Sequence, residues 1–250
     1  FETEGMYTFD DFNYENGVYK LKEGVSDNSS LTRPRRFWPG ALKLKDQNGD
    51  FVVDAENDKV IIGNTNPKHV GGFSFTTQYK GFDLSAAFNW VYGNDVYNAN
   101  KLYFYMYATG YNYKNILDIS NSNNRFIYID KETGLEVSDP TKLAEMNKNA
   151  TLWSTAMTHA ALHSWVIEDG SFLRLNNLTL GYTIPETLVN RIGLESLRIY
   201  ATGYNLWICT KYTGYDPEVD TRRATPLTPG IDWNAYPRNR SFNIGLNIEF

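Results

Sequence analysis

The end of the sequence alternates strictly between apolar and polar residues. In SFNIGLNIEF, one parity carries Phe242, Ile244, Leu246, Ile248 and Phe250, and the other carries only serine, asparagine, glycine and glutamate. Successive side chains of a β-strand point to opposite faces, so an extended segment with this pattern has one apolar and one polar face. Such a strand fits one side of a soluble sheet, or the wall of a barrel with lipid outside and water inside.

Residues 70–93 repeat this alternation in two arms. The stretch GGFSFTTQYKGFDLSAAFNWVYG places Phe73 and Phe75 on one parity of the first arm, and Phe82 and Trp90 on one parity of the second. The link YKG between the arms is as short as the turns of β-hairpins. We therefore predict a β-hairpin over this range.

Residues 171–208 contain two further strands joined by the compact connection ETLVNRIGLE. In DGSFLRLNNLTLGYTIP the apolar parity changes at Asn176-Asn177, which predicts a β-bulge at this point. In SLRIYATGYNLWI two parities compete, because Leu197 favours one and Tyr204 favours the other. The sequence leaves the facing of this second strand open.

Long polar connections separate these strands, whereas the other links are short. They cover residues 1–69, 94–170 and 209–240. The first is predicted to be irregular because Gly, Asn, Asp and Pro recur in it, and TKLAEMNKNA in the second predicts a short helix. Short links therefore lie at one end of the strands and long ones at the other, as in outer-membrane barrels. A soluble up-and-down sheet can share this asymmetry.

The composition excludes several classes of protein. The chain has 250 residues with a formal net charge of −5, so it lacks the basic footprint of a nucleic-acid-binding protein. Cys209 is the single cysteine, which excludes an internal disulfide framework and a multi-cysteine metal site. No stretch approaches the roughly 20 apolar residues of a membrane helix. The start, FETEGMYTFDDF, does not have the pattern of a secretory signal peptide.

Five segments together cover almost the whole chain, in order. The short one, near the start, is GMYTFDDF, and the longer ones are KLKDQNGDFVVDAENDKVIIGNTNPKHVGGFSFTTQYKGFDLSAAF, DGSFLRLNNLTLGYTIP, RIYATGYNLWICTKYTGYDPEV and GIDWNAYPRNRSFNIGLNIEF. The longer segments resemble the C-terminal part of SusC/RagA-like TonB-dependent transporters, and GMYTFDDF is similar to a loop of that family.

The resemblance implies an all-β fold, an antiparallel transmembrane β-barrel segment that supplies the C-terminal strands of a plugged barrel of roughly 22 strands. Its barrel strands would be the hairpin 70–93, residues 171–208 with their periplasmic turn, and 241–250. The long extracellular loops would be 1–69, which holds an Asp/Asn-rich turn, 94–170 and 209–240. So few strands cannot close such a barrel, and an open edge in lipid leaves backbone groups unpaired. We therefore expect residues 1–250 to be part of a longer protein.

The function implied by the resemblance is TonB-dependent import of oligosaccharides or peptides across the outer membrane of a Gram-negative, Bacteroidota-like bacterium. The implied partners are a SusD-like surface lipoprotein that covers the barrel, the TonB complex, the N-terminal plug and remaining barrel of the same protein, and outer-membrane lipid. Transport involves no bond chemistry, so we predict no catalytic residues and no required cofactor. The alternatives are a soluble secreted β-rich glycan-binding domain and a barrel protein of another family.

Aromatic residues in the long connections are the candidates for substrate contact. Rings stack on sugar faces, and neighbouring Asn or Asp side chains bind hydroxyl groups. The candidates are Tyr105, Tyr107, Tyr111, Trp153, Trp165 and Trp233. Packing within large loops and the aromatic girdles of a barrel are the competing explanations for these rings.

The stretch DQNGDFVVDAEND resembles a calcium-binding loop in its spacing. Asp46, Asn48, Asp50 and Asp54 occupy the first, third, fifth and ninth positions, which would direct several oxygen atoms toward one Ca²⁺ ion. The remaining positions differ from a calcium-binding loop, because Phe51 replaces the usual glycine and an asparagine replaces the bidentate glutamate. An Asx-rich turn, in which these side chains bind their own backbone, is the alternative.

Two other features have weaker functional interpretations. His159 and His163 are four residues apart, as zinc ligands on a helix are, but no third ligand is evident and ordinary loop histidines are favoured. The terminal Phe250 matches the aromatic end that barrel proteins of the resembled family present to the assembly machinery. It also completes the apolar parity of the last strand.

Overall fold

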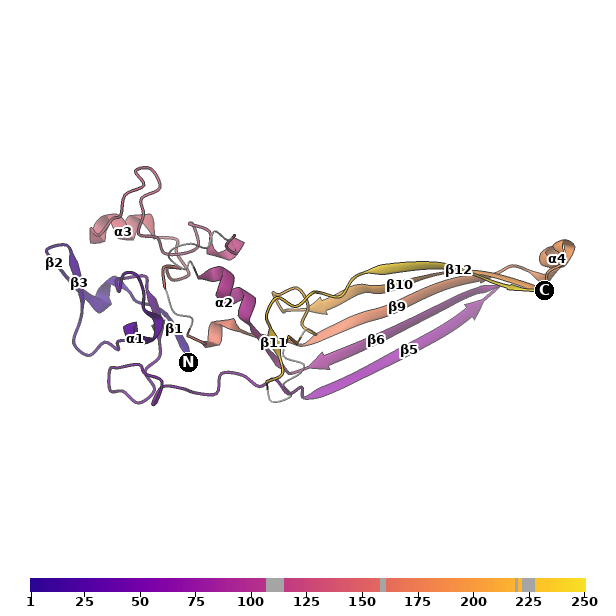
Figure 1. The fold of residues 1–250 in the computed structure, drawn as a ribbon, viewed down its shortest axis with the longest axis horizontal. Helices are drawn as coiled ribbons and strands as arrows, with labels where there is room; N and C mark the ends of the chain where they lie inside the picture. Colours follow the sequence, from indigo (N-terminus) through magenta and orange to yellow (C-terminus); the bar gives the residue numbers. More distant parts are fainter. Residues whose placement is uncertain (107–114, 158–160, 219, 222–227) are drawn as a thin grey trace. The chain divides into compact units, whose positions relative to one another are not determined.

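A five-stranded antiparallel sheet is the largest element of the computed structural model (Figure 1). Its spatial order is β12-β10-β9-β6-β5, so β5 and β12 form its two edges and the sheet is open. The strands are β5 (His69–Tyr79), β6 (Phe82–Tyr92), β9 (Phe172–Thr183), β10 (Ser196–Thr210) and β12 (Ser241–Glu249).

Two short connections lie at the same end of this sheet as the last residue of β12 (Figure 1). Lys80 and Gly81 join β5 to β6, and both have positive φ, at 48° and 85°, which matches the twist of a tight hairpin. Gly81 also needs to lack a side chain, because a Cβ atom there would lie 2.8 Å from the carbonyl oxygen of Thr183. The β9–β10 connection contains α4 (Glu186–Val189) and the 3₁₀ helix η4 (Asn190–Ile192).

The chain divides into two compact units, each built from two separate stretches. Unit 1 contains residues 1–63 and 98–167, and unit 2 contains residues 64–97 and 168–250. The structure describes residues 1–106, 115–157, 161–218, 220–221 and 228–250. The five-stranded sheet belongs to unit 2.

Unit 1 consists of short elements. Two antiparallel strand pairs are β1 (Thr3–Met6) with β4 (Leu42–Leu44), and β2 (Phe12–Glu15) with β3 (Val18–Leu21). Its α-helices are α1 (Ser29–Thr32), α2 (Ala99–Tyr105) and α3 (Pro140–Met146). Its 3₁₀ helices are η1 (Phe9–Asp11), η2 (Asp118–Ser120) and η3 (Ser164–Val166). Most residues of a small sheet with the order β11-β7-β8 belong instead to unit 2. Its strands are β7 (Asp95–Asn98), β8 (Ile167–Asp169) and β11 (Ile231–Asp232).

Aromatic side chains form most of the core of unit 1. The core contains Tyr7, Phe12, Tyr19, Ala41, Phe126, Tyr128, Val137 and Leu143. The buried tyrosines keep hydrogen bonds, as Tyr residues in cores generally do: the hydroxyl of Tyr7 donates to the carbonyl of Ser26 at 2.6 Å, and that of Tyr128 donates to the carbonyl of Pro39 at 3.0 Å. This network holds segments that are far apart in sequence in one unit.

The short helix predicted around TKLAEMNKNA is confirmed as α3, which begins after Asp139, whose side chain accepts a hydrogen bond from Lys142 N. The prediction that residues 1–69 are irregular is wrong in part. Strands β1–β4 lie there, and each has only three or four residues, too few for a readable alternation. The all-β expectation fits the sheets, but unit 1 adds short helices. In the described part of the chain, no helix combines the length and apolar character needed to cross a membrane.

Candidate functional site

One face of the five-stranded sheet is predominantly apolar across all its strands. The register places Phe73 opposite Phe88, with their rings stacked at 4.7 Å, and places Phe88 opposite Leu175 on the next strand. We call this surface the apolar face; it includes Phe73, Phe75, Phe82, Leu84, Phe88, Trp90, Leu173, Leu175, Leu178, Leu180, Leu197, Ile199, Trp207, Phe242, Ile244, Leu246 and Ile248.

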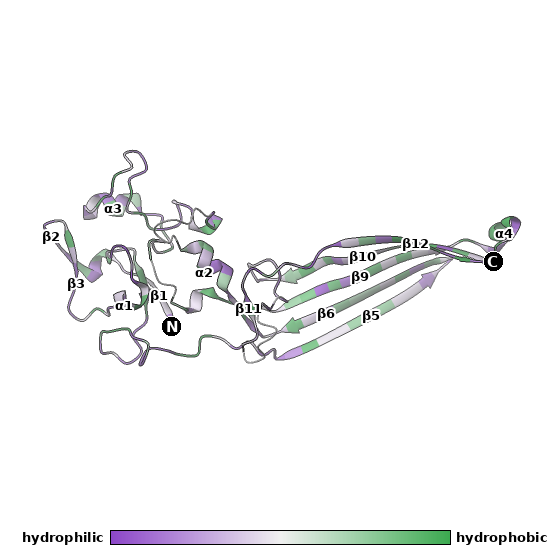
Figure 2. Ribbon diagram, in the orientation of Figure 1, coloured by the Kyte–Doolittle hydropathy of each residue, from purple (hydrophilic) through white to green (hydrophobic). Residues whose placement is uncertain are grey.

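The apolar face is exposed in unit 2. Ile244 is 83 % exposed, Phe242 73 % and Leu246 59 %. Figure 2 shows hydrophobic colour distributed along the strands of this sheet. Exposed apolar surfaces of this extent mark contacts with another protein or with a membrane.

The opposite face carries polar side chains, which bind one another across the strands. The hydroxyl groups of Thr179 and Thr202 lie 2.8 Å apart, and Thr76 donates to Ser85 at 3.3 Å. We call this surface the polar face. Because residues that are directly paired share a face, the two surfaces have opposite character over most of the sheet. Val70, Val91 and Phe172 are apolar residues at one end of the polar face.

Irregularities in two strands keep the apolar residues on one face. In β9, Asn176 is inserted between Asn177 and Leu175, which pair with the adjacent Ala87 and Phe88 of β6. The bulge predicted at Asn176-Asn177 is thus confirmed. In β10, the register shifts between Tyr204 and Trp207, and this places Leu197, Ile199 and Trp207 on the apolar face.

An ion pair spans three strands on the polar face. Arg198 of β10 donates from Nε to Asp83 Oδ1 at 2.8 Å and from Nη2 to Asp83 Oδ2 at 2.5 Å, and Asp83 lies on β6. The two side chains meet across β9 at Gly181. A Cβ atom at Gly181 would lie 2.4 Å from Asp83 Oδ1, so the glycine leaves room for the pair.

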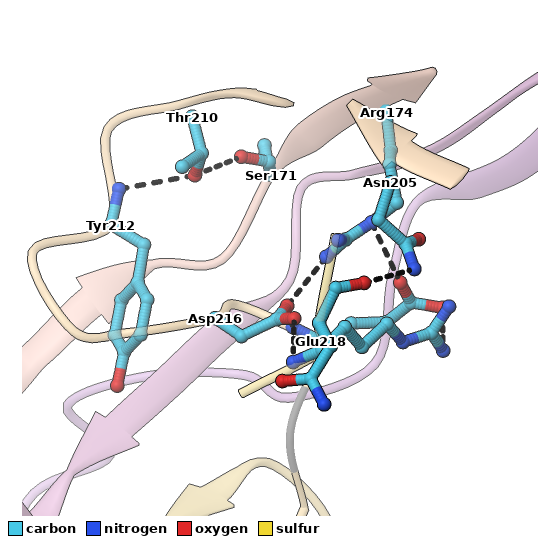
Figure 3. A network of polar contacts seen from close by, with 9 residues as sticks. Ser171, Arg174, Asn205, Thr210, Tyr212, Asp216 and Glu218 are labelled. Carbon is cyan, nitrogen blue, oxygen red and sulfur yellow. Dashed lines mark hydrogen bonds and ion pairs between the residues drawn. The ribbon is translucent and has the colours of Figure 1, made fainter. Parts of the chain in front are cut away.

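A buried network of charged residues joins the polar face to the connection after β10 (Figure 3). Arg174 of β9 lies 2.6 Å from Asp216 through Nη2 and 3.2 Å from Glu218 through Nε. Glu218 also accepts a hydrogen bond from Arg238 at 2.8 Å. The side chains of Arg174 and Asp216 are only 5 % and 4 % exposed.

Further hydrogen bonds lie beside and within the same connection (Figure 3). The hydroxyl of Thr210 donates to the carbonyl of Ser171 at 2.8 Å, and Asn205 Nδ2 donates to the carbonyl of Asn239 at 3.0 Å. The hydroxyl of Tyr212 donates to Asp232 at 2.7 Å. Among the described residues of this connection, Asn239 is therefore bound to β10 through Asn205, and Tyr212 is bound to Asp232 of the same connection.

Three of the predicted substrate-contact rings pack against one another in unit 1. Tyr105 lies 5.6 Å from Trp153 and 4.9 Å from Trp165 between ring centroids, and its hydroxyl donates to the carbonyl of Trp153. Tyr105 and Trp153 are 1 % and 3 % exposed. The structure gives these two residues a packing role, and contact with substrate at any of the three stays a prediction.

His163 completes this aromatic cluster. Its ring lies 5.5 Å from Trp153 and stacks with Trp165 at 6.2 Å, and its Nδ1 is 2.8 Å from the hydroxyl of Thr3. Burial, followed by nearby positive charges such as that of Lys101, lowers the pKa of His163 from 6.5 to about 3. The described residues offer no partner to its Nε2.

Acidification is expected to destabilise this cluster. The folded-state pKa of His163 lies below its unfolded value, so the unfolded state binds the proton first, and stability falls as the pH drops from 6.5 toward 3. The loss is up to about 1.4 kcal/mol per pH unit. This loss of stability is measured by hydrogen exchange of peptides within 151–166 in the longer protein. The exchange rates are corrected for the intrinsic effect of pH on exchange. His163→Gln should remove the dependence, and an equal pH slope in that variant would contradict this account.

The other predicted site residues lie apart from this cluster. Trp233 follows β11 in unit 2 and is 46 % exposed. Phe250 follows β12 and is also exposed, and its role in assembly stays a prediction. Tyr107, Tyr111 and His159 lie outside the described residues.

The residues of the predicted calcium loop bind the backbone of the loop itself. The side chain of Asp46 accepts hydrogen bonds from Gly49 N and Phe51 N. Asn48 accepts one from Asp50 N, and Asp50 accepts one from Val52 N. Asp54 accepts hydrogen bonds from Glu56 N and Asn57 N. The buried Asp58 accepts from Gln47 N and Asp54 N. Within the described ranges, no group of three or more His, Cys, Asp or Glu residues could hold a metal ion. These bonds form the Asx-rich turn, and calcium binding stays a prediction.

Sequence reasoning did not single out the charged residues of the polar face. Asp83 and Arg198 fall on the polar parity of their strands, which is the one signal that could have marked them. Arg174, Asp216 and Glu218 are distant in sequence, and only the fold brings them together.

The comparisons with known proteins point to one group. No protein-family model matches the chain. It is 33 % identical over 214 residues to a TonB-dependent receptor of Formosa agariphila, covering 84 % of this chain and 19 % of that protein. It is 29 % identical over 209 residues to the TonB-dependent receptor SusC of Bacteroides thetaiotaomicron, covering 82 % of this chain and 17 % of SusC.

Solved structures agree on the fold. The RagAB peptide transporter superposes with a TM-score of 0.54 at 24 % identity, over 79 % of this chain and 19 % of that chain. The RagAB peptide importer in its closed-closed state superposes with a TM-score of 0.56 at 19 % identity, over 100 % of this chain and 22 % of that chain. The chain spans about a fifth of the length of the curated relatives that it matches. It belongs to the SusC/RagA-like TonB-dependent receptors, and it corresponds to a part of such a protein.

Proposed function

We propose that the five-stranded sheet of unit 2 is part of the wall of an outer-membrane β-barrel. The observation that carries this proposal is the opposite character of the two faces, which continues across all five strands. The apolar face contacts lipid and the polar face lines the water-filled interior. The open edges at β5 and β12 pair with other strands of the same protein, because unpaired backbone groups are costly in hydrocarbon.

The barrel belongs to a TonB-dependent importer of oligosaccharides or peptides. The names of the relatives, SusC and the RagAB peptide transporter, support this class of function. The partners are the TonB complex and a SusD-like surface lipoprotein that covers the barrel. The protein lies in the outer membrane of a Gram-negative, Bacteroidota-like cell. Its N-terminal plug and remaining strands complete the barrel.

The long connections face the outside of the cell. They begin or end at the strand ends that lie opposite to the β5–β6 turn and the α4 connection. Among the predicted substrate-contact residues that the structure describes, Trp233 is the most exposed, and it has an accessible ring for a sugar or an apolar side chain.

Uptake by whole cells tests this function. A strain that lacks the gene is compared with its complemented parent for growth on single oligosaccharides and on defined peptide mixtures. We expect the deletion to abolish uptake of at least one of these substrates, and removal of TonB to have the same effect. Uptake that needs this gene but survives loss of TonB would contradict the proposal.

A further inference from the structure

Unit 1 contains a cavity of about 450 Å³ whose residues come from three segments. The segments lie within 35–36, 122–136 and 154–156, and the central one supplies most of the wall. This volume falls within the range of about 300–1,000 Å³ that is usual for small-molecule sites. Apolar groups dominate the lining, with contributions from Phe126, Ile129 and Ala156.

The lining of this apolar cavity also includes four basic residues. They are Arg35, Arg36, Arg125 and Lys131. Arg36 is neutralised by Glu136, to which it donates two hydrogen bonds of 3.0 Å. Lys131 donates to the side-chain oxygen of Asn123 at 2.8 Å. The acidic Asp130 in the lining is already paired with Lys142 at 2.5 Å.

Unlike Arg36, Arg35 and Arg125 form no ion pair with a carboxylate of the described residues. The guanidinium of Arg125 donates instead to the carbonyl of Ser120. The remaining residues of the chain contain no Asp or Glu. Arg125 is half-buried, and burial lowers the pKa of its guanidinium. A cation removed from water without an anion is costly, so the cavity favours an incoming negative charge.

We propose that this cavity binds a small organic carboxylate, with the carboxylate between Arg35 and Arg125 and an apolar body against Phe126 and Ile129. Guanidinium groups bind carboxylates through paired, charge-assisted hydrogen bonds. The apolar lining favours an aliphatic or aromatic body over a sugar ring, which would need several hydrogen-bonding partners for its hydroxyl groups. This proposal does not depend on the proposed transport function, because ligand binding is measured on the purified protein without any transport.

Ligand-observed NMR on the full-length protein in detergent tests the proposal. The probe is N-acetylphenylalanine, and its primary amide is a control of the same shape without the charge. We expect the acid to bind and the amide to bind about tenfold more weakly or worse. Raising the ionic strength should weaken binding of the acid.

Variants test the assignment to these arginines. Arg35→Ala removes an exposed side chain, and it should weaken binding by about tenfold. Arg125→Gln should do the same. Lys148→Ala removes a positive charge of unit 1 outside the cavity, so it should leave binding unchanged.

Several results would overturn the proposal. These are equal binding of the acid and the amide, full binding by both arginine variants, and an equal loss in Lys148→Ala. Binding of glucuronate in place of N-acetylphenylalanine would show that the ligand is a sugar acid, and it would refute the apolar body. If Arg125→Gln fails to fold, Arg35→Ala still decides the outcome.

Discussion

Replacing Arg174 with alanine is expected to destabilise the attachment of residues 211–218 to the sheet by about 3–5 kcal/mol. The variant leaves Asp216, whose side chain is 4 % exposed, buried without its cationic partner. Removing one member of a buried ion pair costs more than the pair contributes, because the remaining charge is still desolvated. Hydrogen exchange of peptides within 209–218 in the full-length protein measures this loss directly.

Arg238→Ala is the matched control within the same network. Its guanidinium bonds Glu218 at 2.8 Å, but its side chain is 44 % exposed, so water can replace the contact. We expect its removal to cost about 0–1 kcal/mol. Equal effects of the two substitutions would show that burial does not set the strength of this network.

Replacing Leu246 with arginine is expected to destabilise the folded protein in the membrane by about 2–4 kcal/mol, and to lower its level in the outer membrane. Leu246 lies in the middle of β12 on the apolar face, opposite Ile199 of β10. If this face contacts hydrocarbon, the new charge has no water or counter-ion near it. Quantification of the folded protein in outer-membrane fractions, with urea unfolding in lipid vesicles, measures both effects.

Asn243→Arg provides the control three residues away. Asn243 lies on the polar face, opposite Thr202, so the added charge faces the interior of the proposed barrel. We expect a much smaller loss than for Leu246→Arg. A larger loss for Asn243→Arg would reverse the assignment of the two faces, and a stable, soluble Leu246→Arg protein would favour the secreted glycan-binding domain.

Alternation of side chains made the strands predictable. The alternation of apolar and polar residues in β12 and in the β5–β6 hairpin is evident from the sequence. A strand with one apolar face needs the same kind of residue at every second position. The bulge at Asn176-Asn177 could be predicted for the same reason. The alternation changes parity there, and one inserted residue returns the apolar residues to the same face.

The facing of β10 could not be predicted in the same way. Leu197 and Tyr204 have opposite parity, and both are plausible on an apolar face. Pairing with β9 and β12 resolves the conflict by placing Leu197 opposite Ile248 and Tyr204 opposite Ser241. Register depends on the neighbouring strands as well as on the strand itself.

Aromatic residues show the limit of composition as a guide to function. Tyr105 and Trp153 have the chemistry of a sugar-binding ring, yet the structure packs them against Trp165 and His163. An exposed ring and a buried ring have the same letter in the sequence. Only the positions of the surrounding segments distinguish them.

The sequence by itself determined the strands, their two-sided character and the family to which the chain belongs, because these properties are carried by local periodicity and by long similar segments. Tertiary structure alone decided which charges meet. Arg174 and Asp216, Arg198 and Asp83, and the arginines around the cavity of unit 1 come together through pairing and packing of distant segments. The strength of each charge depends on its burial and its partners, and neither is a local property of the chain.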